Sequence, residues 1–349
     1  MSLRLHLNFK SLIFSALSMI AWGGGGLVRA EESGKILEAF QEQARTILKK
    51  CGGAVVRIEA TDDHGRLGGT GFFIDPSGTL YTSYGVGGES EDICVTFRGK
   101  NYRAERLTSD SRSGVAILKI GAETPFLTFA KGRSIGVASP VIALGYPGEM
   151  SLTPSLGTVG GFDLKYGERF FATTHIRANV PVQQGEGGAP LMNTKGEVVG
   201  ILISMFGSGN ASFVLPIEAA EKVRMDFKRF REARPGWVGI QVQGAELAIK
   251  GSTARIDEVQ AEGPAAKAGL QAGDILLQVG TRKILNPEDV LDASFFLTAD
   301  DATTVRFSRG GVESKVQVQP VDPPNSLRRS LPAIGAAGKL GLPPVLSVP

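Results

Sequence analysis

The residues of greatest chemical interest form one glycine-rich run at 184–193, which reads Gln-Gly-Glu-Gly-Gly-Ala-Pro-Leu-Met-Asn. Covalent catalysis in such a loop would need a hydroxyl or thiol that a neighbouring base activates. The run contains no serine, threonine, cysteine or histidine, and beyond the first thirty residues the only histidines are His64 and His175. Glycine offers neither an oxygen nor an imidazole, so the run has no means of nucleophilic attack.

The run and two upstream stretches resemble the catalytic segments of HtrA/Deg-type trypsin-like serine proteases. In that family a Gly-Asn-Ser-Gly-Gly-Pro-Leu loop enters a Gly-Glu-Val-Val-Gly-Ile strand, and Gly187 stands at the serine position. Residues 69–86 match the hairpin before the catalytic histidine and put Gly85 at that position. Residues 113–120 match the Asp-Leu-Ala-Val-Leu-Lys-Ile strand and put Gly114 at the aspartate position. The resemblance therefore implies a catalytic triad in which every member is glycine.

Chance explains this coincidence poorly, although the chain contains 46 glycines. Random placement of glycine would fill all three positions in roughly two chains per thousand. Removing the triad of a serine protease costs on the order of a millionfold in turnover and leaves only the oxyanion hole and substrate binding. The resemblance implies that the backbone N–H groups of Gly185 and Gly187 form this hole. A peptide carbonyl could therefore still bind there.

No second catalytic constellation is apparent. His64 falls in a predicted loop and His175 on a predicted strand, and single histidines in such places are typically solvated or packed. Ser83 shares a strand face with Gly85, but no base accompanies it. The sequence shows no metal-ligand spacing and predicts no cofactor. Other departures from the family lie close to the triad positions, with Asn179 where the family favours Asp and Glu186 where it favours Asn.

Two sets of short strands must position these residues. Between 54 and 216 the chain alternates runs rich in Val, Ile and Phe with Gly, Pro, Ser and Asp turns. The first set is predicted at 55–60, 70–74, 80–83, 93–97, 102–107 and 116–120. The second is predicted at 141–146, 155–162, 170–177, 190–192, 198–205 and 212–215. The pattern and the resemblance together predict a mainly β fold, a trypsin-like double β-barrel with the active-site cleft between its halves.

Residues 237–320 resemble a PDZ domain of the HtrA type. The run 263–276 matches the Gly-Leu-x-x-Gly-Asp signature, and Asn286 can cap a helix that starts at Pro287. The resemblance implies that an extended peptide adds itself to a strand while backbone N–H groups hold its carboxylate. The alternative is a PDZ module that only packs on the barrel. The expected peptide-binding residues are Val238, Gly239, Ile240, Gln241 and Val242.

The remaining segments complete the predicted organisation. Residues 1–30 have a basic opening, an apolar run and a small-residue cleavage pattern, which are typical of a secretory signal peptide. The apolar run is shorter than the roughly twenty residues that span a bilayer, so an uncleaved anchor is the less favoured alternative. Residues 31–53 predict an N-terminal helix, residues 217–236 a connecting helix and hinge, and residues 321–349 a disordered Pro/Gly-rich tail. The protein is expected in the periplasm or another extracytoplasmic space.

Charge and cysteine content limit the partners. The formal charge of +3 falls to zero once the signal segment, with its three basic residues and no acid, is removed. No nucleic-acid surface is therefore predicted, and the basic residues of the helix at 217–232 are expected on a solvated face. Cys51 and Cys94 could form a disulfide in an exported protein or remain buried thiols. The sequence does not decide between a monomer and a homo-oligomer.

These features predict an exported HtrA-like pseudoprotease that binds peptides. Its expected partners are protein C-termini or unfolded envelope proteins, and its role is chaperone-like or regulatory, with an active HtrA-like relative as a further partner. One alternative is a serine endopeptidase of envelope quality control that uses an unrecognised nucleophile. Another is a structural subunit of a protease assembly, in which the barrel is only a contact surface.

Overall fold

The computed structural model describes residues 38, 41–63, 65–132, 134–166, 169–206 and 211–324. The predicted signal peptide, the tail from residue 325 and His64 lie outside the described residues. The chain divides into one unit up to Lys49 and a second from Lys50 onward, and each is described by itself. Residues 41–51 are helical, which agrees with the predicted N-terminal helix.

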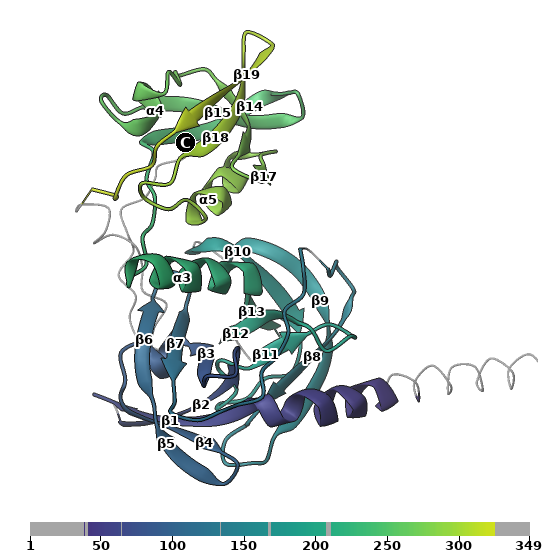
Figure 1. The fold of residues 1–349 in the computed structure, drawn as a ribbon. Helices are drawn as coiled ribbons and strands as arrows, with labels where there is room; N and C mark the ends of the chain where they lie inside the picture. Colours follow the sequence, from purple (N-terminus) through teal and green to yellow (C-terminus); the bar gives the residue numbers. More distant parts are fainter. Residues whose placement is uncertain are drawn as a thin grey trace, which may run out of the picture. The chain divides into compact units, whose positions relative to one another are not determined.

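Residues 55–119 form an open, antiparallel sheet of seven strands in the order β5-β4-β1-β2-β3-β7-β6 (Figure 1). The sequence predicted six strands, because it did not reveal that the segment 102–107 breaks at Ala104. The amide of Ala104 donates to the carbonyl of Ile93 at 2.8 Å, and the two halves of the segment then run to opposite edges of the sheet. The strands are β1 (Val55–Asp62), β2 (Gly65–Phe73), β3 (Thr79–Ser83), β4 (Glu91–Phe97), β5 (Lys100–Arg103), β6 (Glu105–Asp110) and β7 (Val115–Lys119).

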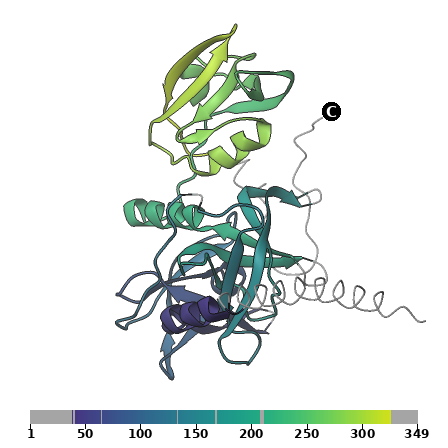
Figure 2. The same cartoon turned by 90° about the vertical axis from the view of Figure 1, so that its right-hand side faces the viewer.

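Residues 140–216 form a closed, antiparallel barrel in the order β10-β13-β12-β11-β8-β9 (Figures 1 and 2). All six strands of the second predicted set are present. Alternate residues such as Val141, Ile176, Leu191 and Val214 face the barrel core, as the period of two in a strand requires. The strands are β8 (Pro140–Gly145), β9 (Thr153–Tyr166), β10 (Arg169–Asn179), β11 (Pro190–Met192), β12 (Val198–Phe206) and β13 (Ala211–Pro216).

The C-terminal domain, residues 237–321, is a separate sheet in the order β14-β15-β16-β18-β19, with β17 paired to β16. The predicted cap is present, since the Asn286 side chain accepts from the amide of Asp289 at 3.0 Å and helix α5 begins at Pro287. The elements are β14 (Ile240–Ile249), β15 (Ser252–Val259), α4 (Pro264–Lys267), β16 (Ile275–Val279), β17 (Arg282–Lys283), α5 (Pro287–Phe295), β18 (Thr303–Arg309) and β19 (Val312–Val318).

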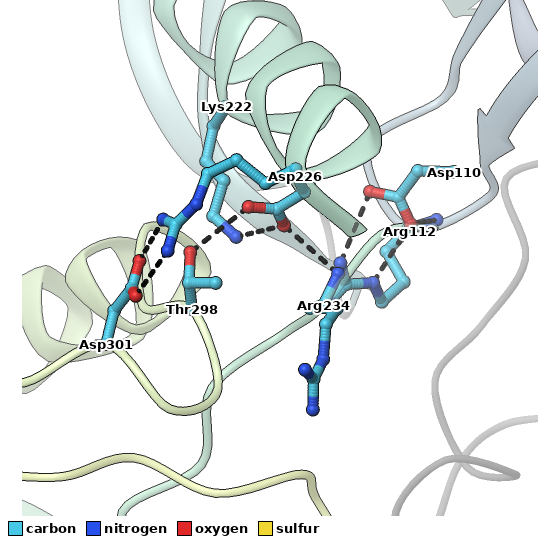
Figure 3. A network of polar contacts seen from close by, with 8 residues as sticks. Asp110, Arg112, Lys222, Asp226, Arg234, Thr298 and Asp301 are labelled. Atoms are coloured by element: carbon cyan, nitrogen blue, oxygen red, sulfur yellow. Dashed lines mark hydrogen bonds and ion pairs between the residues drawn. The ribbon is translucent and has the colours of Figure 1, made fainter. Parts of the chain in front are cut away.

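Helix α3 (Ile217–Phe230) connects the barrel to the C-terminal domain, and its Asp226 joins the two (Figure 3). This carboxylate is 4% exposed and accepts hydrogen bonds from the Lys222 ammonium, from the Arg234 amide at 3.1 Å and from the Thr298 hydroxyl at 3.1 Å. A buried carboxylate is costly unless several donors surround it. Arg229 of the same helix pairs with Asp301 at 2.5 and 2.8 Å. These basic residues of α3 therefore have acidic partners within the chain.

A second buried carboxylate, Asp292 of α5, accepts from strand β10. Its donors are the Thr173 hydroxyl at 2.6 Å, the Thr174 amide at 2.7 Å and the Arg282 guanidinium at 2.6 Å. The pairing of β10 with β9 is irregular between Phe170 and His175, so the Thr174 amide takes a side-chain acceptor instead. Burial by itself would raise the pKa of Asp292, but these hydrogen bonds and the charge of Arg282 bring it below its usual value.

His175 is packed beneath this contact and plays no part in a cleft. Its ring is fully buried, stacks on Phe171 at 4.3 Å between centroids, and places Nδ1 2.7 Å from the carbonyl of Thr173. Nε2 has no hydrogen-bond partner among the described residues. Burial lowers the pKa of His175 to about 4, so the imidazole is neutral at neutral pH.

This burial predicts an acid-sensitive step in stability. The fold favours the neutral imidazole, so the contribution is complete above the unfolded pKa of 6.5 and is lost as the pH falls toward 4. The free energy of unfolding should drop by about 3 kcal/mol more in the native protein than in a His175→Phe variant over that range. Urea unfolding of both proteins between pH 7.5 and 4 measures the difference. Equal pH slopes would contradict the prediction.

Candidate functional site

The three glycine positions that the sequence singled out converge around one short segment. Gly85 is the second residue of helix α2 (Tyr84–Gly87), which directly follows β3. The amide of Tyr84 donates to the carbonyl of Gly114 at 2.6 Å. The Ser83 hydroxyl oxygen lies 3.1 Å from the point that a β-carbon on Gly187 would occupy. The fold therefore brings the three positions together, as the family resemblance implied.

The space around the three glycines differs. A β-carbon on Gly85 would meet no atom within 4 Å, so the place of an imidazole is open. A β-carbon on Gly187 would touch only the Ser83 hydroxyl closely. Gly114 has φ +80°, a conformation that side-chain-bearing residues rarely adopt, and the side chain of Ile203 lies 3.2 Å from its β-carbon position. Position 114 is therefore the least compatible of the three with a side chain.

Thr70 of β2 fixes the backbone of the loop at 184–188. Its hydroxyl donates to the carbonyl of Gly185 at 2.8 Å and accepts from the amide of Tyr146 at 2.9 Å. Its amide donates to the carbonyl of Gly187 at 2.9 Å. Thr70 is fully buried. One residue of the first sheet thus holds two carbonyls of the glycine loop.

The amides of Gly185 and Gly187 remain free to bind a ligand. The carbonyl of Gln184 accepts from the Gly148 amide at 2.6 Å, and that of Glu186 accepts from the Ala189 amide at 3.0 Å. In a trans peptide the N–H points opposite to the carbonyl, so the amides of Gly185 and Gly187 point away from these bonds. None of the described residues accepts a hydrogen bond from either amide. The predicted oxyanion-hole donors are therefore not consumed within the loop.

Arg57 of β1 contacts the segment 146–150, which holds this loop. Its guanidinium donates to the carbonyls of Gly148, at 2.8 Å, and Met150, and it lies 5.2 Å from the centre of the Tyr146 ring. Because Gly148 in turn holds the carbonyl of Gln184, Arg57 acts on the orientation of the Gly185 amide through one intervening residue.

The two departures from the family pattern, Glu186 and Asn179, each lie against a glycine. Glu186 is 2% exposed and accepts from the Gln183 amide at 2.6 Å. A β-carbon on Gly145 would lie 2.9 Å from its side chain, so glycine there makes room for it. Burial raises the pKa of Glu186, and the Gln183 amide offsets part of that rise. Asn179 ends β10, and its side-chain oxygen lies 3.0 Å from a β-carbon position on Gly160.

The residues predicted to bind peptides, Val238–Val242, lead into strand β14 of the C-terminal domain. The carbonyl of Trp237 accepts from Val321 at 3.0 Å, that of Val238 from Ala265 at 2.9 Å and that of Gly239 from Gln260 at 2.9 Å. The amides of Val238, Gly239 and Ile240 therefore point the other way, and none has a backbone acceptor outside the regular strand pairing of the described residues. Gly239 has φ +79°, which lets successive amides converge as an anion-binding nest does.

An open strand edge continues from this nest. Strand β14 is the edge strand of its sheet, so one side of its backbone has no strand beside it. Helix α5 packs against β14 and forms the other wall. Val238, Ile240, Val242 and Val290 are partly buried hydrophobic residues at this place. The side chains of Gln241 and Gln243 bond to β15, at Glu258 and Asp257. The edge can therefore pair with an extended peptide next to an apolar wall.

The two cysteines are free thiols rather than a disulfide. Cys51 is buried and donates to the carbonyl of Gly196 at 3.7 Å, and burial raises the pKa of its thiol. Cys94 is half-buried in β4. In the part of the chain that the structure describes, no cluster of His, Cys, Asp or Glu is suited to a metal ion. None of the described helices has the length and apolar character that a membrane crossing requires.

Comparison with known proteins agrees with this geometry. Residues 69–201 match the trypsin-like peptidase domain, and residues 255–307 match the PDZ domain. A probable periplasmic serine endoprotease, DegP-like, of Pseudomonas fluorescens is 29% identical over 263 residues, which are 72% of this chain and 55% of the relative. A protein of the same description from Pseudomonas savastanoi pv. phaseolicola is 30% identical over 235 residues, 64% of this chain and 49% of the relative. The chain thus spans about half the length of these relatives.

Solved structures share the fold. The HtrA-type protease AlgW with a tripeptide has a TM-score of 0.68 and 20% identity, covering 84% of this chain and 99% of its own. A serine endoprotease from Yersinia pestis has a TM-score of 0.58 and 24% identity, covering 80% and 98%. The predicted trypsin-like domain followed by a PDZ domain is confirmed, although the first sheet is open rather than a closed barrel. The relatives are named periplasmic, which confirms the predicted location.

Sequence reasoning missed Thr70 and Arg57, which orient the loop without belonging to a triad position. Thr70 is the second residue of the Gly-Thr-Gly-Phe motif at 69–72, where the family has serine, so a hydroxyl at this point was the available signal. Nothing in the sequence near Arg57 indicates a bond to residues ninety positions later. Such contacts follow only from the fold.

A Thr70→Val variant tests whether this hydroxyl supports the loop. It leaves the Gly185 carbonyl and the Tyr146 amide without their partner, so the free energy of unfolding should fall by about 2–4 kcal/mol. Thr82→Val is the matched control, because the buried Thr82 hydroxyl makes one bond, to the Thr70 carbonyl at 2.8 Å. Urea unfolding should show a smaller loss for the control. A loss at Thr70 no larger than that at Thr82 would contradict this role.

Proposed function

The chain has a trypsin-like peptidase domain and a PDZ domain and is a homologue of DegP-like, HtrA-type endoproteases, and from this we propose that it is a peptide-binding pseudoprotease. It binds protein C-termini or unfolded segments of envelope proteins through the PDZ groove and the vacant cleft. Its role is that of a chaperone-like protein or of a regulator of an active relative.

The observation that carries the proposal is a loop with two free backbone amides and no side chain at position 187. The amides of Gly185 and Gly187 are free and Thr70 holds their loop, but positions 85, 114 and 187 carry no side chain. A serine hydroxyl needs a base to become a nucleophile, and the one histidine within the described residues, His175, is packed beneath Asp292. Binding is the chemistry that survives this loss.

Cleavage of an unfolded substrate tests the proposed loss of catalysis. We expect no cleavage of casein by the mature protein and weak cleavage by a variant with Gly85→His, Gly114→Asp and Gly187→Ser. The strained backbone at position 114 and the side chain of Ile203 oppose the restored aspartate. Adding Ile203→Ala should therefore raise the rate about tenfold, the effect of about 1.4 kcal/mol of relieved strain. Release of fluorescent peptides from labelled casein is the measurement.

The same assay tests the endopeptidase alternative. Ser83 is the specific observation in its favour, because its hydroxyl oxygen lies 3.1 Å from the β-carbon position of Gly187. A fluorophosphonate probe should leave the native protein unlabelled and label the variant with restored serine and histidine. Labelling and cleavage by the native protein that Ser83→Ala abolishes would establish Ser83 as a nucleophile and refute the pseudoprotease.

A variant in strand β14 tests peptide binding in the PDZ groove. An Ile240→Pro variant removes one amide that faces the open edge of β14, and we expect at least a tenfold loss in affinity for a peptide with a free C-terminal leucine. Gln243→Ala is the control, since the Gln243 side chain bonds to Asp257 of β15. Fluorescence polarisation with a labelled hexapeptide measures both. Equal affinities for the native protein and the proline variant would exclude capture through this groove.

A structural subunit remains the third candidate, and the regulator role requires an active relative as partner. Native mass measurement of the protein, alone and mixed with an active HtrA-type protease, separates the two. A mixed assembly without peptide binding by either site would favour the structural subunit.

A further inference from the structure

We propose that the vacant cleft is a receptor for a terminal carboxylate, held by the amides of Gly185 and Gly187 and by the Ser83 hydroxyl. This inference rests on the proposed function and names the ligand class of the cleft. One carboxylate oxygen takes the place of a peptide carbonyl between the two amides. The other takes the place of the missing serine oxygen, within reach of Ser83.

The position of Ser83 is the first observation. Its hydroxyl oxygen lies 3.1 Å from the β-carbon position of Gly187, so it borders the space that a serine side chain would fill. Ser83 is 3% exposed, and none of the hydrogen bonds among the described residues engages its hydroxyl. A hydroxyl can rotate its hydrogen toward a new acceptor. It is therefore a further donor, beside the β-carbon position of Gly187.

The empty positions are the second observation. In a protease the serine oxygen and the imidazole occupy the space beside the oxyanion hole. Here position 187 has no side chain, and a β-carbon at position 85 would contact nothing within 4 Å. The second oxygen of a carboxylate can enter this space without displacing protein atoms.

Charge decides between a terminal carboxylate and an internal carbonyl. Hydrogen bonds to an ionised acceptor are about twice as strong as those to a neutral one. The nearest acid in the loop is Glu186, whose carboxylate bonds to the Gln183 amide and lies against Gly145. The glycine loop and the PDZ nest share one feature, since each offers backbone amides without an acceptor outside regular strand pairing among the described residues.

The test must separate the cleft from the PDZ groove, so it uses the full-length protein with Ile240→Pro. The probes are a fluorescein-labelled Ala₅-Leu peptide with a free C-terminus and the same peptide as its C-terminal amide. Fluorescence polarisation should give at least tenfold tighter binding of the free acid. Ser83→Ala should remove most of this preference, and Ser83→Asp should abolish it by charge repulsion. Ser212→Ala, a buried serine bonded to the Val180 carbonyl, is the matched control and should keep it.

A second variant guards against misfolding at Ser83. Gly187→Ala keeps the amide but places a methyl group where the second carboxylate oxygen would lie, so it too should abolish the preference for the free acid. Thermal melts of every variant establish folding. Equal binding of acid and amide, or a preference that all the cleft variants retain, overturns the proposal. If the native protein binds the free-acid peptide and the Ile240→Pro protein does not, the PDZ groove binds the peptide and the proposed carboxylate receptor in the cleft is rejected. No binding by either protein would reject the proposed function itself.

Discussion

The hydrogen bonds of Thr70 are the constraint on which the site depends. This residue belongs to the first sheet, yet its hydroxyl and amide hold the carbonyls of Gly185 and Gly187, more than a hundred residues later. The same hydroxyl accepts from Tyr146, whose loop is held by Arg57. Two separately formed β-structures therefore meet at one buried threonine. These bonds to the loop involve no side chain at positions 85 or 187.

The sequence predicted features that neighbouring residues determine, but it missed contacts between residues far apart in the chain. Local signals succeeded: the period of two defined the strands of the second barrel, and Asn286 with Pro287 defined the start of α5. The family resemblance implied that Gly85, Gly114 and Gly187 lie together before any contact was known. Long-range contacts were missed, because the residues around Arg57 and Asp292 in the sequence do not indicate which distant residues they contact. The break at Ala104 was missed for the same reason, since the carbonyl of Ile93 defines it.

The backbone around the three glycines places a different limit on a side chain at each position. Position 85 is open and position 187 is crowded only by a rotatable hydroxyl, so side chains there are compatible with the present backbone. Position 114 combines a left-handed backbone with the side chain of Ile203 against it. A side chain at 114 would need both to change. The surroundings of Gly114 therefore exclude a side chain more strongly than those of Gly85 and Gly187 do.

The domain contacts lead to a related conclusion about the peptide groove. One wall of the groove is α5, and the Asp292 side chain of that helix accepts from Thr173 and Thr174 of the barrel. Asp226 of α3 accepts from the hydroxyl of Thr298, which lies three residues after the end of α5. Each carboxylate is buried, so separating the domains would leave a charge with fewer donors than it needs. Any ligand that shifts α5 must therefore act against these two carboxylates. A displacement of α5 and the packing of β10 are for this reason energetically linked.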